Sequence, residues 1–189
     1  MLIRIGFEII VTSPAPVPML MALSTHSDFP GRIIGEDKVR SSSGAPVSVY
    51  LDGFGNRISR SVAPQGSTTY WSDCVAEVSG LPDHVPLGAP QHKVEDLPNE
   101  TLNFLTASRY GDSDRLTEAA WKQFGSTPEG WDRVQAISNF VHNHVTFGYK
   151  FGRPDKTAFN VFQEKTGVCR DFAHLGVSLC RAMNIPARY

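Results

Sequence analysis

The sequence is poor in cysteine, in charge of one sign and in long apolar runs, and each shortage excludes a class of protein. Its three cysteines are an odd and low number, which argues against a disulfide framework and leads us to expect a reducing, cytoplasmic location. The formal net charge of −1 gives no indication of a nucleic-acid or membrane-surface partner. No run approaches the roughly 20 apolar residues that span a bilayer. What remains is an ordinary globular composition, with 41% hydrophobic and 20% charged residues.

Residues that could hold a metal are also sparse. The sequence has no Cys-x-x-Cys pair, so a thiolate zinc site has no support. His142 and His144 lie in a helical pattern, where a spacing of two directs side chains about 200° apart and prevents shared ligation. We therefore expect neither a metal nor an organic cofactor.

The first 80 residues have the pattern of short strands. Apolar residues alternate with polar or small ones from Ile3 to Ile9, which is the period of a half-buried strand. Arg4 and Glu8 interrupt this run and no small-residue cleavage site follows it, so a strand is favoured over a signal peptide. Further strands are predicted at 17–23, 33–40, 47–51, 57–62 and 67–78. Residues 1–80 are therefore predicted to form an antiparallel, β-sandwich-like domain.

The pattern then changes from strands to helices, which predicts an α+β chain of two domains. Residues 81–98 contain four prolines and little periodicity, and we predict an extended linker there. Helical spacing begins at residue 99 and predicts helices near 102–105, over 113–124, over 128–144 and after Asp155 or Thr157. Residues 99–189 are thus predicted to form a mainly helical domain.

A final helix is predicted after Thr166–Gly167, with Thr166 as its N-cap and Asn184 and Pro186 at its end. Apolar residues recur at helical spacing from Phe172 to Met183, so one face is predicted to be buried. Cys169 falls in the first turn, where the partial positive charge of the helix N-terminus favours the nucleophilic thiolate. Cys180 lies about three turns further on and is interpreted as a buried structural residue.

The segment G-V-C-R-D-F-A-H-L, with L-C-R-A-M-N-I-P-A-R-Y after it, resembles the nucleophile segment of the bacterial transglutaminase-like (papain-like cysteine protease) superfamily. Segments 108–116, 131–141 and 157–169 extend the resemblance. It implies that Cys169 attacks a carboxamide or peptide carbonyl of a peptide or protein substrate and forms a thioester acyl-enzyme. It also implies a β domain in front of an incomplete papain-like core.

The resemblance further implies a catalytic His in a strand some tens of residues after the Cys, and an Asp beyond it. The chain stops at Tyr189, so we expect the front part of a longer enzyme, without that His and Asp and inactive alone. The helix that begins near Cys169 would then keep an uncovered apolar face, through which the chain could form a homo-oligomer.

Other polar residues near Cys169 allow more than one interpretation. Gln163 could complete an oxyanion hole with the backbone N–H of Cys169, although plain solvation explains it as well. Asp171 is predicted to support the first helical turn, and Arg170 would favour a thiolate if it lies close. His174 lies about 140° around the helix from Cys169 and is interpreted as a structural histidine.

Two functions therefore remain open from the sequence. One is a cysteine peptidase or amidase, with Cys169 as nucleophile and as backbone oxyanion donor. The other is a non-catalytic module that binds peptide or protein through its β domain, with the Cys169 segment kept for packing.

Overall fold

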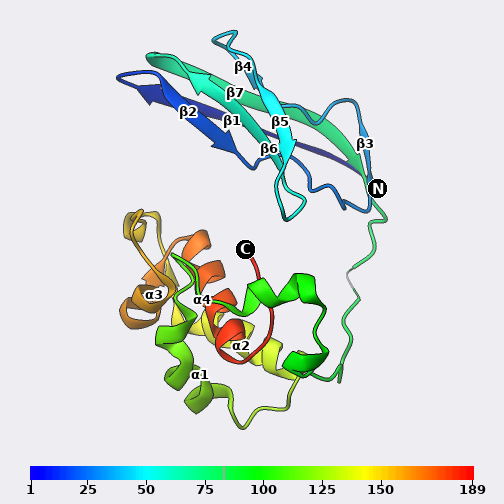
Figure 1. Cartoon of the computed structure of the whole chain (residues 1–189), viewed down its shortest axis with the longest axis vertical. Coiled ribbons are helices and arrows are strands. Elements are labelled where there is room, and N and C mark those ends of the chain that lie inside the picture. The colour runs from blue at the N-terminus through cyan, green and yellow to red at the C-terminus, as the bar shows by residue number, and fades with distance from the viewer. Residues whose placement is uncertain (83) are drawn as a thin grey trace. The chain divides into compact units, whose positions relative to one another are not determined.

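The computed structural model describes residues 1–82 and 84–189, and the chain divides into two compact units, Met1–Asp83 and His84–Tyr189 (Figure 1). Long strands lie in the first unit, and the helices lie in the second. The predicted α+β fold class is therefore confirmed. A membrane-crossing segment would need a longer and more apolar helix than any that the described residues form.

The first unit consists of two antiparallel sheets. One sheet has the order β1-β7-β3, with the short strand β4 also paired to β7, and the other has the order β2-β6-β5. The first sheet is formed by β1 (Leu2–Ser13), β7 (Gly66–Glu77), β3 (Arg32–Ile34) and β4 (Arg40–Ser41). The second sheet is formed by the shorter strands β2 (Val17–Met21), β6 (Arg57–Ala63) and β5 (Ser48–Leu51).

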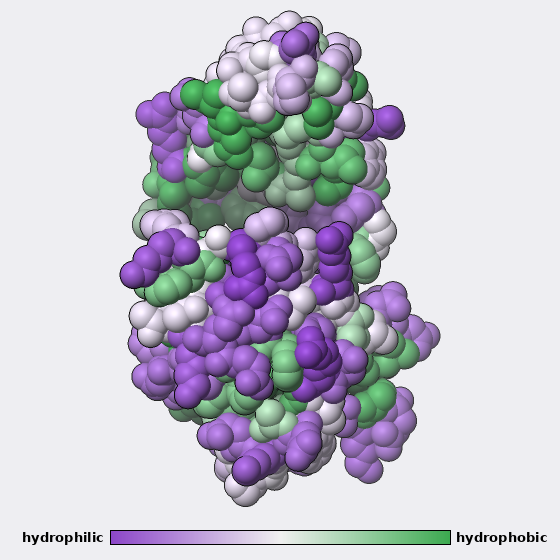
Figure 2. Space-filling model, turned by 90° about the vertical axis from the view of Figure 1, so that its left-hand side faces the viewer, coloured by the Kyte–Doolittle hydropathy of each residue, from purple (hydrophilic) through white to green (hydrophobic). Residues whose placement is uncertain are grey.

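The interior of the first unit is small and partly polar. Its main cluster of buried hydrophobic residues joins Met21, Val39, Ala63 and Tyr70 from both sheets and a loop. Within the described residues, no hydrogen bond reaches the buried hydroxyls of Ser59, Ser61, Thr68, Tyr70 and Ser72. Many apolar side chains of this unit remain on the surface, and Figure 2 shows hydrophobic residues gathered over it.

The second unit is mainly helical. Its longer helices are α1 (Thr117–Phe124), α2 (Trp131–His144), α3 (Ala158–Glu164) and α4 (Cys169–Ala182). Short 3-10 helices are η1 (Val94–Asp96), η2 (Asn99–Leu105), η3 (Ser113–Leu116) and η4 (Tyr149–Phe151). Two short parallel strands, β8 (Thr146–Phe147) and β9 (Thr166–Gly167), complete the unit.

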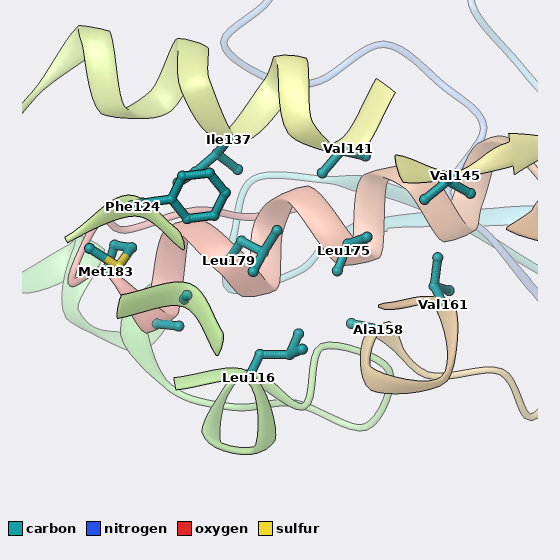
Figure 3. Close-up of a cluster of buried hydrophobic side chains, with 12 residues drawn as sticks. Leu116, Phe124, Ile137, Val141, Val145, Ala158, Val161, Leu175, Leu179 and Met183 are labelled. Carbon is teal, nitrogen blue, oxygen red and sulfur yellow. The ribbon is translucent and has the colours of Figure 1, made fainter. Parts of the chain in front are cut away.

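Helix α4 is the centre of the second unit. Leu175, Leu179 and Met183 are spaced by four residues, so they lie on one face of the helix, and all are buried. Figure 3 shows this row between two sets of side chains. Helix α2 contributes Ile137 and Val141 on one side, and η3 and α3 contribute Leu116, Ala158 and Val161 on the other. Because α4 packs against several elements at once, the position of its first turn is fixed by the core of the unit.

Three sequence-based boundaries were tested by the structure. The predicted strand 33–40 is wrong: β3 ends at Ile34, where Gly35 takes a positive φ of 89° that stops the strand. Thr166 is not the N-cap of the last helix, because it lies in β9 and Val168 holds the cap position. Thr157, by contrast, does cap α3, since its side chain accepts a hydrogen bond from the backbone N–H of Asn160.

Part of the stretch predicted as a linker lies in the second unit. The backbone N–H of Trp131 donates to the carbonyl of Ala89 at 3.0 Å, and the Gln91 amide donates to the carbonyl of Met183 at 2.9 Å. Gln91 also accepts from the buried guanidinium of Arg133 at 3.0 Å. These bonds attach residues 89–91 to the start of α2 and to the residue that follows α4.

Limited proteolysis should therefore cut before Ala89 rather than throughout 81–98. Thermolysin cleaves before large apolar residues, and Leu81, Val85 and Leu87 are exposed and themselves lie outside any helix or strand. We expect early cleavage at these sites, with two protected fragments seen by mass spectrometry. Early cuts inside α2 would contradict the division into two units.

Candidate active site

Cys169 is the first residue of α4 and its side chain is exposed. The chain reaches it through β9, which pairs with β8 so that Thr146 lies opposite Thr166 and Phe147 opposite Gly167. The N–H of Gly148 donates to the carbonyl of Gly167 at 3.0 Å. The segment before the cysteine is thus tied to another part of the unit, which holds the thiol at the surface.

The buried carboxylate of Asp171 caps the first turn of α4. Its Oδ2 accepts a hydrogen bond from the backbone N–H of Val168 at 3.0 Å, and the side chain is fully buried. A Cβ atom on Gly167 would lie 2.7 Å from the Cβ of Asp171, so only glycine leaves room for this carboxylate. Asp171 supports the first turn as expected, through this direct hydrogen bond.

Arg170 links the cap to a neighbouring loop. Its guanidinium donates to Oδ1 of Asp171 at 3.0 Å and to the carbonyl of Arg153 at 2.7 Å. The guanidinium is therefore engaged by two acceptors beside the cysteine. It stabilises the buried carboxylate that caps the helix.

An ion cluster of Arg153, Lys156 and Glu164 lies behind this loop. Lys156 is only 1% exposed, and its ammonium donates to the carbonyl of Thr166 at 2.6 Å and lies 3.0 Å from Glu164. Glu164 also accepts two hydrogen bonds from Arg153, at 2.8 and 2.7 Å. The hydrogen bond from Arg153, with further contributions from Lys156, lowers the pKa of Glu164 from 4.5 to about 2. The cluster fixes the backbone three residues before Cys169.

The backbone N–H of Cys169 is available to a ligand. Across residues 1–82 and 84–189, no hydrogen bond uses this group as a donor. The first N–H groups of a helix have no partner inside the helix and carry partial positive charge. An oxygen that develops negative charge next to the thiol could therefore accept from it.

A groove of about 480 Å³ opens beside the thiol between α2 and α4. Its walls are mostly apolar, and Cys169 and His142 both line it. The lining residues are Val134, Ile137, Ser138, Val141, His142, Cys169, Phe172, Ala173, Gly176 and Cys180. The groove offers an apolar surface next to a nucleophilic atom.

By its spacing in the sequence, His142 was not expected to serve as a base for Cys169, and as a possible metal ligand it was paired with His144. The packing of α2 against α4 nevertheless places His142 on the groove. A signal was present, because Ser138 and His142 are spaced by four and share a helical face. Nothing in the sequence showed that this face borders the cysteine helix.

The other two thiols are less exposed than that of Cys169, although half-buried Cys180 also lines the groove. Burial raises the pKa of Cys180 to about 11. Burial also raises the pKa of Cys74, which lies in the first unit. Cys169 is therefore the exposed thiol among the three cysteines of the chain.

The other two histidines of the helices, His144 and His174, pack against aromatic rings. The His174 ring stacks on Tyr110 with centroids 5.5 Å apart, and burial lowers the pKa of His174. His144 bonds to the carbonyl of Phe162 at 2.8 Å and stacks on Phe140. Among the described residues, no group of three or more His, Cys, Asp or Glu side chains could hold a metal ion.

Gln163 does not join this arrangement. It is exposed on α3, and it is not among the residues that line the groove. Its neighbour Glu164 instead pairs with Lys156, which donates a hydrogen bond to the carbonyl of Thr166 just before Cys169.

The resemblance inferred from the sequence agrees with comparisons with known proteins. The model of the transglutaminase-like superfamily matches residues 118–189, which include Cys169. The match covers less than half of the chain and lies within the second unit. No curated protein matches the sequence.

A solved structure is similar over nearly the whole chain. This crystal structure is of a "Putative Cysteine Protease from Cytophaga hutchinsonii", which is 24% identical, with a TM-score of 0.80. The match covers 98% of this chain and 67% of that chain. The folds of both units thus occur together in a second protein.

Replacing Asp171 with Ala should destabilise the second unit by about 2–4 kcal/mol, because the Val168 N–H and the Arg170 guanidinium lose a buried acceptor. Urea unfolding followed by circular dichroism at 222 nm, which reports helix, measures this loss. Asp132→Ala is the matched control: Asp132 lies in the first turn of α2 but is less buried, and should cost less than about 1 kcal/mol. Equal losses in both variants would contradict a buried cap.

The ion cluster should make stability depend on pH in the acid range. Since the folded-state pKa of Glu164 is about 2, below the ordinary 4.5, its contribution is complete above pH 4.5 and is lost as the pH falls toward 2. Thermal unfolding of the wild type and Glu164→Gln across that range tests this. The variant should be less stable at pH 7 and should lose less stability on acidification. Parallel curves would show that Glu164 makes no such contribution.

Proposed function

We propose that Cys169 is the nucleophile of a cysteine acyl-transfer enzyme that acts on carboxamide or peptide carbonyl groups. The main support is the exposed thiol of Cys169, which lies at the start of α4 and borders an apolar groove. The backbone N–H of the same residue has no hydrogen-bond partner among the described residues. The superfamily match over this helix supports the same chemistry, as does the similar structure from Cytophaga hutchinsonii, which is named a "Putative Cysteine Protease".

The proposed reaction has two stages. The sulfur of Cys169 attacks the carbonyl carbon, and the carbonyl oxygen becomes an oxyanion that accepts a hydrogen bond from the Cys169 N–H. The C–N bond then breaks, the amine takes a proton and leaves, and a thioester remains. Water completes a hydrolysis, whereas a second amine completes a transfer.

The proton steps require a group beyond the thiol. A general acid or base near the reacting atoms typically contributes about 10²–10⁴-fold. His174 is a poor choice, because its ring stacks on Tyr110 and burial lowers its pKa. We propose that residues 1–189 supply the nucleophile without the His and Asp of a triad, so that an activated ester can acylate Cys169 while amides are not turned over.

An activated ester separates the nucleophile from the proton donor, because p-nitrophenolate leaves without being protonated. With p-nitrophenyl acetate we expect a burst of about one equivalent of p-nitrophenolate and an acetyl group on the Cys169 peptide, since this thiol is exposed. Cys169→Ala should abolish the burst, and Cys180→Ala should retain it. A burst that survives in Cys169→Ala would overturn the assignment.

A peptide p-nitroanilide, whose amine does need protonation, tests the absence of the triad partners. We expect no steady hydrolysis by the wild-type chain. Steady hydrolysis that disappears in both Cys169→Ala and His142→Gln would show that His142, which also lines the groove, is the base. The nucleophile would then stand, and the proposal of missing partners would be wrong.

A further inference from the structure

The first unit contains a cavity of about 370 Å³. It lies on one face of β1 and β7, where Ile5 pairs with Cys74 and Phe7 pairs with Ser72. This volume is within the range of small-ligand pockets, roughly 300–1,000 Å³. All its lining residues belong to the first unit, so the cavity is separate from the Cys169 groove.

The cavity lies beside the sheet that has the longer strands. Strands β1 and β7 each have 12 residues, whereas β2, β5 and β6 have 5, 4 and 7. The loop residues Leu23 and Asp37 line the cavity beside the longer sheet.

Ser72 gives the cavity an unused polar group. Its side chain is 5% exposed and lines the cavity, and no hydrogen bond within the described residues reaches its Oγ. Burying a hydroxyl without a partner is unfavourable, and an apolar residue of similar size would serve the fold at least as well. A bound molecule with a hydrogen-bond donor would satisfy this oxygen.

Asp37 gives the cavity a negative charge. Its Oδ2 accepts hydrogen bonds from the backbone N–H and the hydroxyl of Thr25, at 2.6 and 2.7 Å, so the carboxylate is held in place. No lysine, arginine or histidine is among the lining residues. The pKa of the Cys74 thiol is raised mainly by its burial and next by the negative charge of Asp37. The charge of Asp37 therefore acts on another residue that lines the cavity. A cation is therefore favoured over an anion.

We propose that this cavity binds a primary alkylammonium group, with the ammonium between Asp37 and Ser72 and the alkyl chain against Ile5, Phe7 and Leu23. An ammonium supplies three donors and a positive charge, which suit a carboxylate and an unpaired hydroxyl oxygen. Two sources share this chemistry, a free amine and the side chain of a peptide lysine. The site gives the strand unit a binding role that is independent of Cys169.

Isothermal titration of the 189-residue chain with n-pentylamine, and with 1-pentanol as the uncharged analogue, tests the proposal. We expect binding of the amine and not of the alcohol. Ser72→Ala should weaken amine binding several-fold while the melting temperature stays equal or rises, because the hydroxyl has no partner among the described residues. Asp37→Asn should weaken binding about tenfold or more. Asp73→Asn is the control, because Asp73 is the next residue on β7 and bonds to Arg4 outside the cavity.

Nα-acetyl-lysine amide distinguishes the two sources. Tighter binding than n-pentylamine would support a peptide lysine, and weaker binding would support a free amine. Absence of binding by both amines at about 10 mM would overturn the proposal. Equal binding of pentanol, or Ser72→Ala and Asp37→Asn variants that bind like Asp73→Asn, would overturn it too. Cys169→Ala should leave the binding unchanged, so the result does not depend on the acyl-transfer activity.

Discussion

The hydrogen bond from the Val168 N–H to the buried carboxylate of Asp171 is the interaction on which the Cys169 site depends. It defines where α4 begins, and therefore which residue stands in the first turn. A carboxylate this deeply buried is stable only with partners, and Arg170 supplies one while also bonding to the Arg153 carbonyl. Gly167 leaves the space that the carboxylate occupies. One short segment thus contains the nucleophile and the means of holding it.

The buried ammonium of Lys156 also holds the backbone of this segment in place. The ammonium of Lys156 binds the Thr166 carbonyl and pairs with Glu164, which also holds Arg153. Because Arg153 in turn accepts from Arg170 through its carbonyl, the ion cluster and the helix cap form one connected network. Rigid support of this kind keeps a reactive group in one geometry, which is what attack on a carbonyl requires.

The buried charges discussed above are paired, whereas several buried hydroxyls, including that of Ser178 in the second unit, have no hydrogen-bond partner among the described residues. In the second unit, the buried charges of Asp171, Lys156 and Arg133 all have partners. In the first unit, several buried hydroxyls are without a hydrogen-bond partner among the described residues, and Ser72 lines a cavity with Asp37. Paired charges give a fixed site for chemistry, whereas an unpaired hydroxyl in a cavity is suited to a ligand that comes and goes.

The sequence by itself determined the features that depend on neighbours along the chain. Period-two alternation predicted β1, the content of Thr, Tyr, Trp and Val predicted β7, and helical spacing predicted α2 and α4. The motif around Cys169 indicated the superfamily whose model matches residues 118–189. Thr157 was recognisable as a cap because a cap bonds within its own first turn. These interactions span a few residues, so local patterns record them.

Only the tertiary structure decided which distant residues meet. It placed His142 on the Cys169 groove, and it used the Thr166 carbonyl to bind Lys156 while the helix begins three residues later, at Cys169. It also bound residues 89–91, which the prolines suggested were a linker, to Trp131 and Met183. Apolar periodicity predicts that one face of a helix or strand is buried, but it does not predict which element covers that face. The covering element depends on how separate helices and sheets pack.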